Sequence, residues 1–143
     1  MIALPDINVL LALAWSNHPH HDAAHRWFAR DAVAGWAACL FTQTGFLRLS
    51  LNPQVVGIAI DCQTAINLLH SLVAHSAHRY VETAPALTAS SFDALVPKII
   101  GYRQGSDATL LHLARVCDLK LTTFDRPVAA VCPWDDNLEL LTP

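Results

Sequence analysis

Short apolar runs alternate along the chain with longer segments in which apolar residues recur every three or four positions. The short runs favour buried strands, and the wider spacing predicts amphipathic helices. Strands are predicted at Ile2–Leu4, Gly35–Leu40, Arg79–Glu82, Leu121–Thr123 and Leu138–Leu141. Helices are predicted at Val9–Trp15 behind an Asn8 cap, at His21–Ala34, from a Thr42 cap to Ser50, at Ile58–Ala74, within Ser91–Ile100 where Pro97 shortens it, at Asp107–Asp118 and, briefly, from Pro127. This alternation predicts a mainly parallel sheet with helices on both faces, in a single α/β domain over residues 1–143.

The composition supports a folded and soluble domain. Apolar residues make up 53% of the 143 residues and charged residues 15%, so the chain can build a core without disulfides or a structural metal. The cysteines are expected to be separate buried thiols of a reduced, cytoplasmic protein, since none forms a C-x-x-C pair: Cys39, Cys62, Cys117 and Cys132. Neither a signal peptide nor a membrane span is predicted.

Three aspartates stand where a parallel sheet places its ligands. Asp6 follows the first predicted strand, and Asp125 follows the strand that ends at Thr123. Asp107 begins a helix, and the positions that share its face carry the apolar residues Leu110, Leu111 and Ala114. In open parallel sheets, ligands bind beyond the carboxyl ends of the strands. We therefore expect these three carboxylates to converge at one edge of the sheet.

Converging carboxylates repel one another unless a cation is present, and oxygen ligands suit Mg²⁺ or Mn²⁺. Such an ion can activate water and stabilise a phosphodiester under attack, so the pattern is compatible with phosphodiester hydrolysis. Each aspartate also has an ordinary structural explanation. Asp6 could cap the first helix, and Asp125 could belong to a turn. Asp107 could be an acid at a helix N-terminus, where the helix dipole favours a negative charge. The residues alone therefore leave the function open.

Four segments in order carry a resemblance to a known family: Pro5-Asp6-Ile7-Asn8-Val9-Leu10-Leu11-Ala12-Leu13, Thr42-Gln43-Thr44-Gly45-Phe46-Leu47-Arg48, Ser106-Asp107-Ala108-Thr109-Leu110-Leu111 and Thr123-Phe124-Asp125-Arg126. The chain resembles the PIN-domain ribonucleases, specifically the VapC-type toxins of bacterial type II toxin–antitoxin systems. That resemblance covers essentially the whole chain.

The resemblance implies a PIN-like three-layer α/β/α fold and a Mg²⁺- or Mn²⁺-dependent endoribonuclease that cleaves RNA. It also implies a homodimer, neutralised by a cognate antitoxin whose tail commonly occupies the active-site groove. Carried over residue by residue, the metal-binding and catalytic acids are Asp6, Asp107 and Asp125, and Thr123 is a supporting polar position.

One position departs from the family pattern. Many PIN nucleases have a glutamate where this chain has Gln43, and an amide contributes no negative charge. We therefore expect Gln43 to support a single-ion site. Among the arginines near the site in sequence order, which are Arg48, Arg103, Arg115 and Arg126, we interpret Arg48 and Arg126 either as contacts to RNA phosphate or as members of ordinary ion pairs.

Three other interpretations stay open. A degenerate PIN domain could bind RNA or a protein without cleavage. An aspartyl-phosphate phosphatase of the haloacid dehalogenase type would need a second acid two residues after Asp6, where this chain has Asn8. His21 and His25 have the spacing of a helical zinc pair, although a solvated helix face is favoured over zinc.

The net charge of −3 at first argues against a nucleic-acid partner. The three site aspartates account for all of that charge, and one divalent ion would reduce the charge of the site to −1. The sequence therefore predicts weak, metal-dependent RNA binding. The apolar excess also suggests a surface for a dimer partner or an antitoxin.

Overall fold

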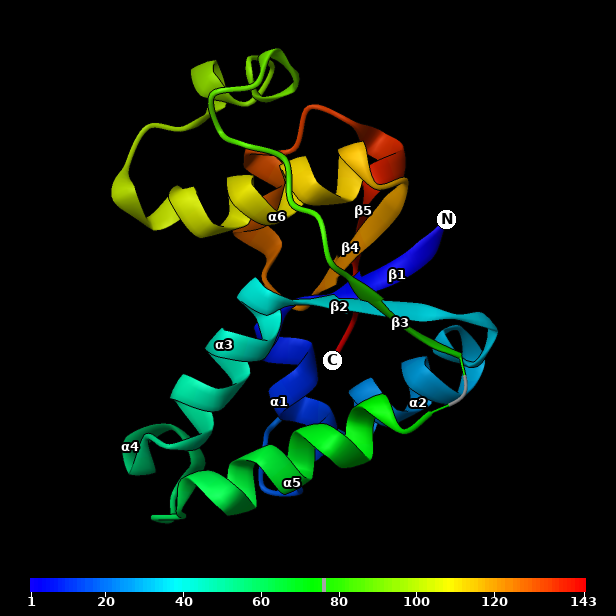
Figure 1. Cartoon of the computed structure of the whole chain (residues 1–143), viewed down its shortest axis with the longest axis vertical. Helices are drawn as coiled ribbons and strands as arrows, with labels where there is room; N and C mark the ends of the chain where they lie inside the picture. Colours follow the sequence, from blue (N-terminus) through cyan, green and yellow to red (C-terminus); the bar gives the residue numbers. More distant parts are fainter. Residues whose placement is uncertain (76) are drawn as a thin grey trace.

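The computed structural model describes residues 1–75 and 77–143. In that part of the chain, five strands form one parallel sheet in the order β3-β2-β1-β4-β5 (Figure 1). The strands are β1 (Ile2–Pro5), β2 (Trp36–Cys39), β3 (His78–Val81), β4 (Leu119–Thr123) and β5 (Leu138–Leu140). All five strands overlap the predicted ones, and the predicted parallel sheet is confirmed.

Helices cover both faces of this sheet. One face carries α1 (Ile7–Ala14), α2 (His21–Arg30), α3 (Leu40–Ser50) and α5 (Cys62–Val73), while α6 (Gly105–Val116) covers the other (Figure 1). The short helix α4 (Pro53–Val56) follows α3. The predicted three-layer α/β/α architecture is therefore confirmed. No helix in the described part of the chain is long and apolar enough to cross a membrane.

Neighbouring residues of each inner strand enter different halves of the core. Ala3 and Trp36 pack with α1 and α2, whereas Leu4 and Ala37 pack with α6. Successive side chains of a strand point to opposite faces, so both faces of this sheet are buried and the strands β1 and β2 are apolar throughout. The largest fully buried side chain is Trp36, in β2.

The pairing of β1 with β4 determines which residues meet at the carboxyl edge. Pro5 pairs with Thr122, and the backbone N–H of Asp6 donates to the Thr122 carbonyl at 2.8 Å. Pro5 has no N–H to donate, and the backbone N–H of Asp6 supplies a hydrogen bond at this end of the strand pair. This register places the side chain of Asp6 beside that of Thr123.

Two helices begin earlier than predicted because a different residue caps each one. Asp6, not Asn8, is the N-cap of α1, and its Oδ1 accepts the N–H of Ile7. Likewise Cys39 is the N-cap of α3, while Thr42 lies inside the first turn and accepts the Cys39 N–H at 3.2 Å. A cap satisfies backbone N–H groups that the first turn leaves free, so these bonds fix where each helix begins.

Two other predicted helices are shorter or absent. Helix α5 begins at Cys62, because Asp61 accepts the N–H of Thr64, and Ile58 is 57% exposed rather than part of an apolar stripe. The helix predicted within Ser91–Ile100 is wrong: the structure has 3₁₀ turns at Ser90–Phe92 and Val96–Lys98. Leu95, between these turns, is buried against α6 and anchors the segment without a helix.

Helix α2 also ends earlier than predicted, at Arg30, and a 3₁₀ turn occupies Ala32–Ala34. A short 3₁₀ helix at Arg126–Ala130 matches the one predicted at Pro127. The four cysteines are free thiols, as expected. Cys39 is buried and two others are half-buried, but Cys62 is exposed at the start of α5, so the prediction of burial is wrong there.

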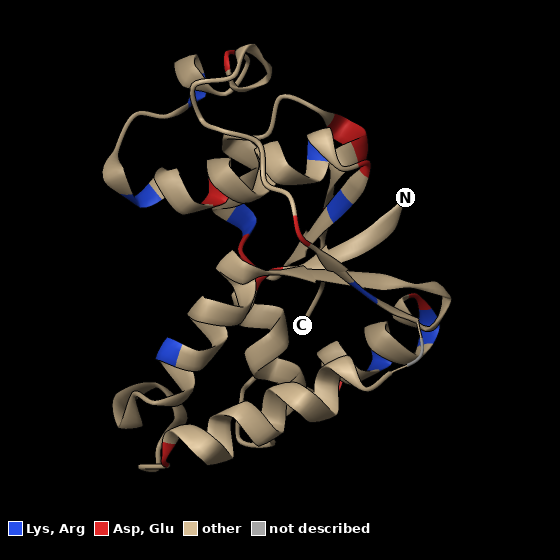
Figure 2. Ribbon diagram, in the orientation of Figure 1, with Lys and Arg blue, Asp and Glu red and all other residues tan. Residues whose placement is uncertain are grey.

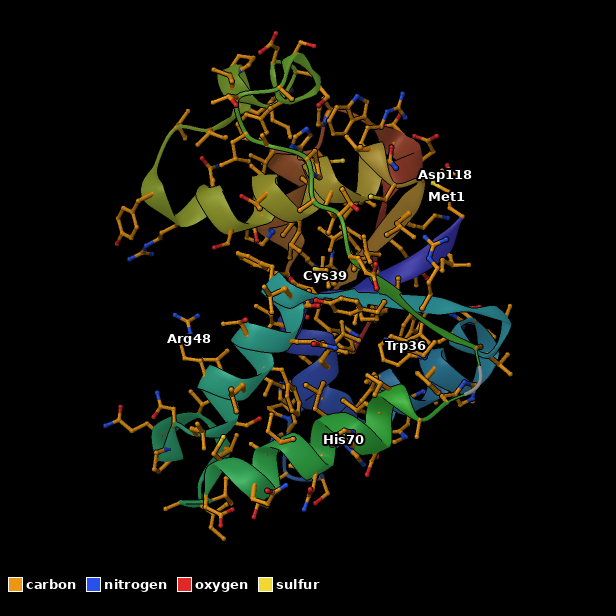
Figure 3. All side chains as sticks on the ribbon, viewed as in Figure 1. Met1, Trp36, Cys39, Arg48, His70 and Asp118 are labelled. Atoms are coloured by element: carbon orange, nitrogen blue, oxygen red, sulfur yellow. The ribbon has the colours of Figure 1, made fainter. Side chains whose placement is uncertain are left out.

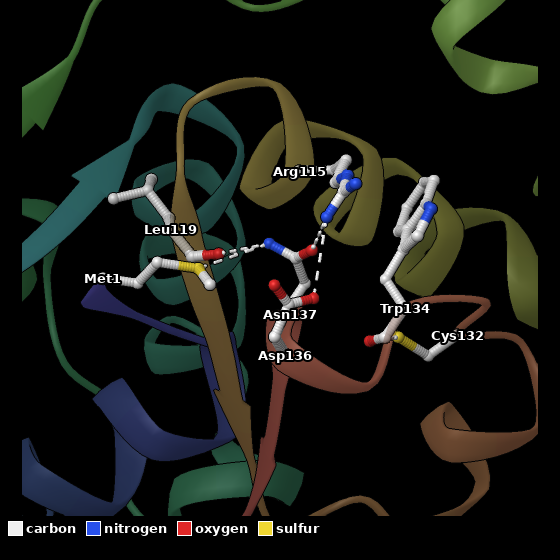
Figure 4. A network of polar contacts seen from close by, with 7 residues as sticks. All are labelled: Met1, Arg115, Leu119, Cys132, Trp134, Asp136 and Asn137. Carbon is white, nitrogen blue, oxygen red and sulfur yellow. Dashed lines mark hydrogen bonds and ion pairs between the residues drawn. The ribbon is translucent and has the colours of Figure 1, made fainter.

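Arg115 belongs to a polar network away from the carboxyl edge (Figure 4). Its guanidinium donates to Asn137 at 3.0 Å and lies 5.4 Å from the ring centre of Trp134. The buried Asn137 in turn donates to the Leu119 carbonyl at 2.8 Å. Leu119 begins β4 and Asn137 precedes β5, so the network fixes the start of this strand pair. Arg115 therefore has a structural role, despite its place in sequence order near the site.

The packing of α3 on α1 requires the absence of a side chain at Gly45. A Cβ atom there would lie 2.7 Å from Ile7 Cγ1 and would also collide with Ile7 Cδ1. At Gly105 a Cβ atom would meet nothing within 4 Å. Gly45 thus allows α3 to pack directly on α1, the helix that follows Asp6.

We expect the same substitution to have opposite effects at these two glycines. Gly45→Ala should lower the free energy of unfolding by about 1 kcal/mol, because overpacking outweighs the better helix propensity of alanine. Gly105→Ala should leave stability equal or slightly higher. Urea denaturation of both variants measures the difference. Equal stability of the two would contradict the tight contact between α1 and α3.

Candidate active site

Asp6 is the best-defined acid at the carboxyl edge of the sheet. Its residue is 8% exposed, and burial is the main cause that raises the pKa of its carboxyl group. Its Oδ1 accepts the N–H of Ile7 at 2.7 Å. Its Oδ2 accepts the Thr123 hydroxyl at 2.9 Å and the Asn8 amide at 3.3 Å. The hydrogen bonds from Thr123 and from the Ile7 N–H lower the pKa of Asp6 and so oppose the effect of burial, because they favour the ionised carboxylate.

Hydrogen bonds of Thr123 and Asn8 join the end of β1 to the end of β4. The Asn8 amide nitrogen donates to Thr123 Oγ1 at 3.0 Å, and the backbone N–H of Asp125 donates to the same oxygen at 3.0 Å. Asn8 Oδ1 accepts the backbone N–H of Phe124 at 3.3 Å. The Thr123 hydroxyl therefore donates its proton to Asp6 and accepts hydrogen bonds from the Asn8 amide and the Asp125 N–H.

Asn8 is the site residue that the sequence analysis missed, because it was interpreted as a helix cap and otherwise considered only as the position where a phosphatase would need a second acid. Its real contacts lie more than 100 positions away in the chain, at Thr123 and Phe124. The available signal was its place two residues after Asp6, which puts it in the first turn of α1 beside the end of the sheet. Recognising it also required knowing that β4 is the neighbour of β1.

The three predicted acids lie close enough to influence one another. Burial raises the pKa of Asp107 to about 6, and repulsion from Asp6 and Asp125 contributes in that order. Repulsion from Asp125 also contributes to the raised pKa of Asp6. Asp107 lies in the first turn of α6, and its face-mates Leu110 and Leu111 are buried as predicted. The fold therefore gathers negative charge from three separate elements.

The three acids would offer a metal ion an open set of oxygen atoms. In the described residues, no three His, Cys, Asp or Glu side chains are grouped closely enough to hold a cation by themselves. Mg²⁺ is usually bound by only one or two carboxylates and keeps several waters, so an open, oxygen-only and mutually repelling set fits that ion. A closed site of the structural zinc type does not fit.

The histidine pair has another role. His21 Nδ1 lies 2.7 Å from the Ala12 carbonyl and His25 Nε2 lies 2.9 Å from the Leu13 carbonyl. Both carbonyls belong to the last turn of α1, where no later residue of the helix can bond to them. The two rings thus cap the end of α1, which is neither a zinc site nor a purely solvated face.

One of the remaining predicted positions, Arg48, lines a groove between α3 and α6. The groove has a volume of about 620 Å³, and its lining includes Phe41, Arg48 and Ser106. Figure 3 shows Arg48 projecting from α3 on the side that faces α6. Gln43 is half-buried in the same helix, but no hydrogen bond of the described residues joins it to the acids.

Arg126 is exposed at the first position after Asp125. The ion pairs in the described part of the chain join Arg30 to Asp31 and Arg115 to Asp136. Neither Arg48 nor Arg126 is engaged in one of these pairs, so their charges are available at the rim of the site.

Sequence comparison places the chain close to two curated ribonucleases. No protein-family model matches the chain. Ribonuclease VapC38 of Mycobacterium tuberculosis is 45% identical over 143 residues, which cover 99% of each chain. Ribonuclease VapC39 of the same organism is 35% identical over 130 residues, covering 90% of this chain and 92% of the relative.

Two solved structures are similar in fold. The crystal structure of VapBC2 from Rickettsia felis, bound to a DNA fragment from its promoter, matches with a TM-score of 0.65 and 14% identity over 99% of this chain and 100% of the other. VapC20 of Mycobacterium tuberculosis, a toxin that cleaves the sarcin–ricin loop, matches with a TM-score of 0.60 and 15% identity over 90% and 93%.

The parallel sheet, its helical layers and these structural neighbours define a PIN domain. The full-length identity to curated relatives goes further, and the chain belongs to the VapC family of ribonucleases. The predicted family is confirmed. The phosphatase interpretation gains no support, because Asn8 is an amide that donates to Asp6 and Thr123 rather than a second acid.

The raised pKa of Asp107 predicts that this acid destabilises the metal-free protein at neutral pH. Its pKa is higher in the folded state than the ordinary 3.8, so its favourable contribution is complete only at low pH and is lost as the pH rises through about 6. Asp107→Asn should therefore raise the free energy of unfolding at about pH 7.5 by about 1 kcal/mol, after allowance for solvent screening of this half-exposed group.

Thermal denaturation in EDTA measures this effect, and we expect a midpoint about 2–4 °C higher for Asp107→Asn. The gain should shrink as the pH falls toward 4. Asp61→Asn is the matched control, since hydrogen bonds from Thr64 lower the pKa of Asp61 and its carboxylate is favoured. A gain of the same size at Asp61, or none at Asp107, would contradict the proposed repulsion.

Asn8→Ala should disturb the site through both of its neighbours. The substitution removes two donors and leaves the N–H of Phe124 without its acceptor, so we expect a loss of about 2 kcal/mol of stability. Asn67→Ala, at an exposed position of α5, should stay within about 0.5 kcal/mol of the wild type. Urea denaturation compares the two. A similar small loss at both positions would show that Asn8 is not part of a cooperative network.

Proposed function

We propose that this protein is a Mg²⁺- or Mn²⁺-dependent endoribonuclease that hydrolyses phosphodiester bonds in RNA. The observation that supports this function most directly is the convergence of Asp6, Asp107 and Asp125 at the carboxyl edge of the sheet, in a chain of the VapC ribonuclease family. The three acids are the proposed metal-binding and catalytic residues, and Thr123 is their supporting polar group.

The chain's own residues prepare the site before a substrate arrives. The donors from Ile7, Asn8 and Thr123 keep Asp6 in one orientation and favour its charged form. Oδ1 of Asp6 accepts only one of these bonds, so this oxygen retains a lone pair for a ligand. A bound divalent ion would supply Lewis acidity at the phosphoryl group and lower the pKa of attacking water. Gln43 in place of an acid favours one ion rather than two.

The basic residues at the rim offset the charge of the acids. Figure 2 shows basic positions on α3, before α6 and beside the carboxyl end of the sheet. Arg48 and Arg126 are the proposed contacts to RNA phosphates, since both are free of the ion pairs described above. An arginine fork matches phosphate geometry, and the interaction strengthens once the acids are neutralised.

We further propose that a cognate antitoxin neutralises the enzyme and that the enzyme acts as a cytoplasmic homodimer. Leu40 is 67% exposed and Phe41 is 38% exposed on the wall of the groove beside the acids. Apolar surface of this kind favours a protein partner. The Rickettsia felis relative is a VapBC assembly, which is consistent with such a partner.

Cleavage of RNA by the purified protein tests the proposed activity. We expect cleavage with Mg²⁺ or Mn²⁺, none in EDTA, and at least about a hundredfold loss in Asp107→Asn and in Asp125→Asn. Asp22→Asn, at an exposed position of α2, is the matched control and should cleave normally.

Equal cleavage by the wild type and both site variants would point to a contaminating nuclease. RNA binding without cleavage under any of these conditions would favour a PIN domain that has lost its activity. Asp107→Asn is preferable to Asp6→Asn, because an amide at position 6 would face the donors of Asn8 and Thr123 and would disturb the fold.

A further inference from the structure

An aromatic side chain stands almost free of the protein just before α6. Tyr102 is 88% exposed and begins the 3₁₀ turn Tyr102–Gln104. It is not part of the lining of the apolar groove between α3 and α6. A large ring in water loses the favourable free energy of burial, so its position suggests a ligand that covers it.

The turn that carries Tyr102 is held in place by its own hydrogen bonds. Gln104 Oε1 accepts the backbone N–H of Ile100 at 2.7 Å, and the Gln104 N–H donates to the Gly101 carbonyl at 3.2 Å. The ring is therefore presented from a closed turn rather than from a loose loop, which reduces the entropy lost when a ligand binds.

Arg103 accompanies the ring. Its Nε donates to the Tyr102 hydroxyl at 3.3 Å, and its guanidinium carbon lies 5.7 Å from the ring centre. In the described part of the chain, no other aromatic side chain stacks on Tyr102. A planar ring beside a cation is the combination that binds unpaired nucleotides, with the base on the ring and the phosphate on the cation.

The position of this pair relative to the acids matches a substrate that extends beyond the cleaved bond. Tyr102 precedes Asp107 by five residues, and its 3₁₀ turn leads directly into the first turn of α6, where Asp107 lies. Arg48 lies across the groove on α3 (Figure 3). An RNA strand that reaches the acids would thus have a basic side chain on either side.

We propose that Tyr102 is a stacking platform for an unpaired RNA base near the cleaved phosphate, with Arg103 contacting the adjoining backbone. This inference rests on the proposed function, because it assumes that RNA enters the acid site. Stacking on a ring does not select a base by hydrogen bonds, so the platform favours unpaired over duplex RNA rather than one sequence.

Fluorescence anisotropy with a labelled pool of short, random, unpaired RNA tests the platform. Binding is measured at fixed salt with Mg²⁺, in an Asp107→Asn background that prevents cleavage. Tyr102→Ala should weaken binding by about tenfold, within the range known for loss of one base stack. Tyr102→Trp should recover most of the affinity, since stacking needs a ring and not the hydroxyl. Equal affinity of Tyr102→Ala and its parent would overturn the proposal.

Ile100→Ser separates RNA stacking from a protein interface. Ile100 is 89% exposed two residues before Tyr102, but an aliphatic side chain cannot stack a base. We expect Ile100→Ser to bind RNA within about twofold of its parent. If instead both variants dissociate an oligomer in light scattering and weaken RNA binding equally, the surface joins copies of the chain and the proposal fails.

The proposed activity has a separate readout. Absence of cleavage by the wild-type protein would refute the nuclease function, while a tenfold effect of Tyr102→Ala on binding would still support the platform. Conversely, normal cleavage together with unchanged binding in Tyr102→Ala would refute the platform alone.

Discussion

The pairing of β1 with β4 is the constraint on which the site depends. The backbone of Asp6 bonds to Thr122, and this single register brings the Asp6 carboxylate against the Thr123 hydroxyl. A shift of one strand by one residue would turn its side chain to the opposite face of the sheet and separate Asp6 from Thr123. Asn8 reinforces the register from the side, since it bonds to Thr123 and to the backbone of Phe124. Packing on both faces of the sheet then holds this edge in place.

Much of the fold could be predicted because its signals are local. The run Ile2–Leu4 is too short for a helix and too apolar for the surface, and Asp107 leads a stripe that includes Leu110 and Leu111. Hydrophobic spacing of this kind predicts whether a segment is a helix or a strand. It does not predict the residue at which a helix begins, because that depends on the capping residue. Asp6 and Cys39 compete with Asn8 and Thr42 for that role, and only the path of the entering backbone decides between them.

The candidate site could be predicted only in part, for a related reason. The carboxyl ends of parallel strands lie at one edge of the sheet, so Asp6, Asp107 and Asp125 were expected to meet there. The contacts of Asn8 depend on two strands that are far apart in the sequence but paired in space. The segment around Leu95 is similar, because one buried side chain against α6 replaces the predicted helix. Arg115 shows the same limit, because its closeness in sequence to Asp107 is not matched by closeness in space.

The short helix α1 has a further consequence for how this protein can lose its activity. Eight residues are too few for a stable helix in isolation, and α1 is closed at one end by Asp6 and at the other by the rings of His21 and His25. The side chain of Asp6 thus helps to hold the fold together, whereas the charge of Asp107 destabilises it, because burial and repulsion raise the pKa of that acid. Inactivation can therefore take two forms. Loss of Asp107 would leave a folded molecule that can still bind its partners but has lost its activity. Loss of Asp6 would unfold the molecule, so that the fold and the activity are lost together.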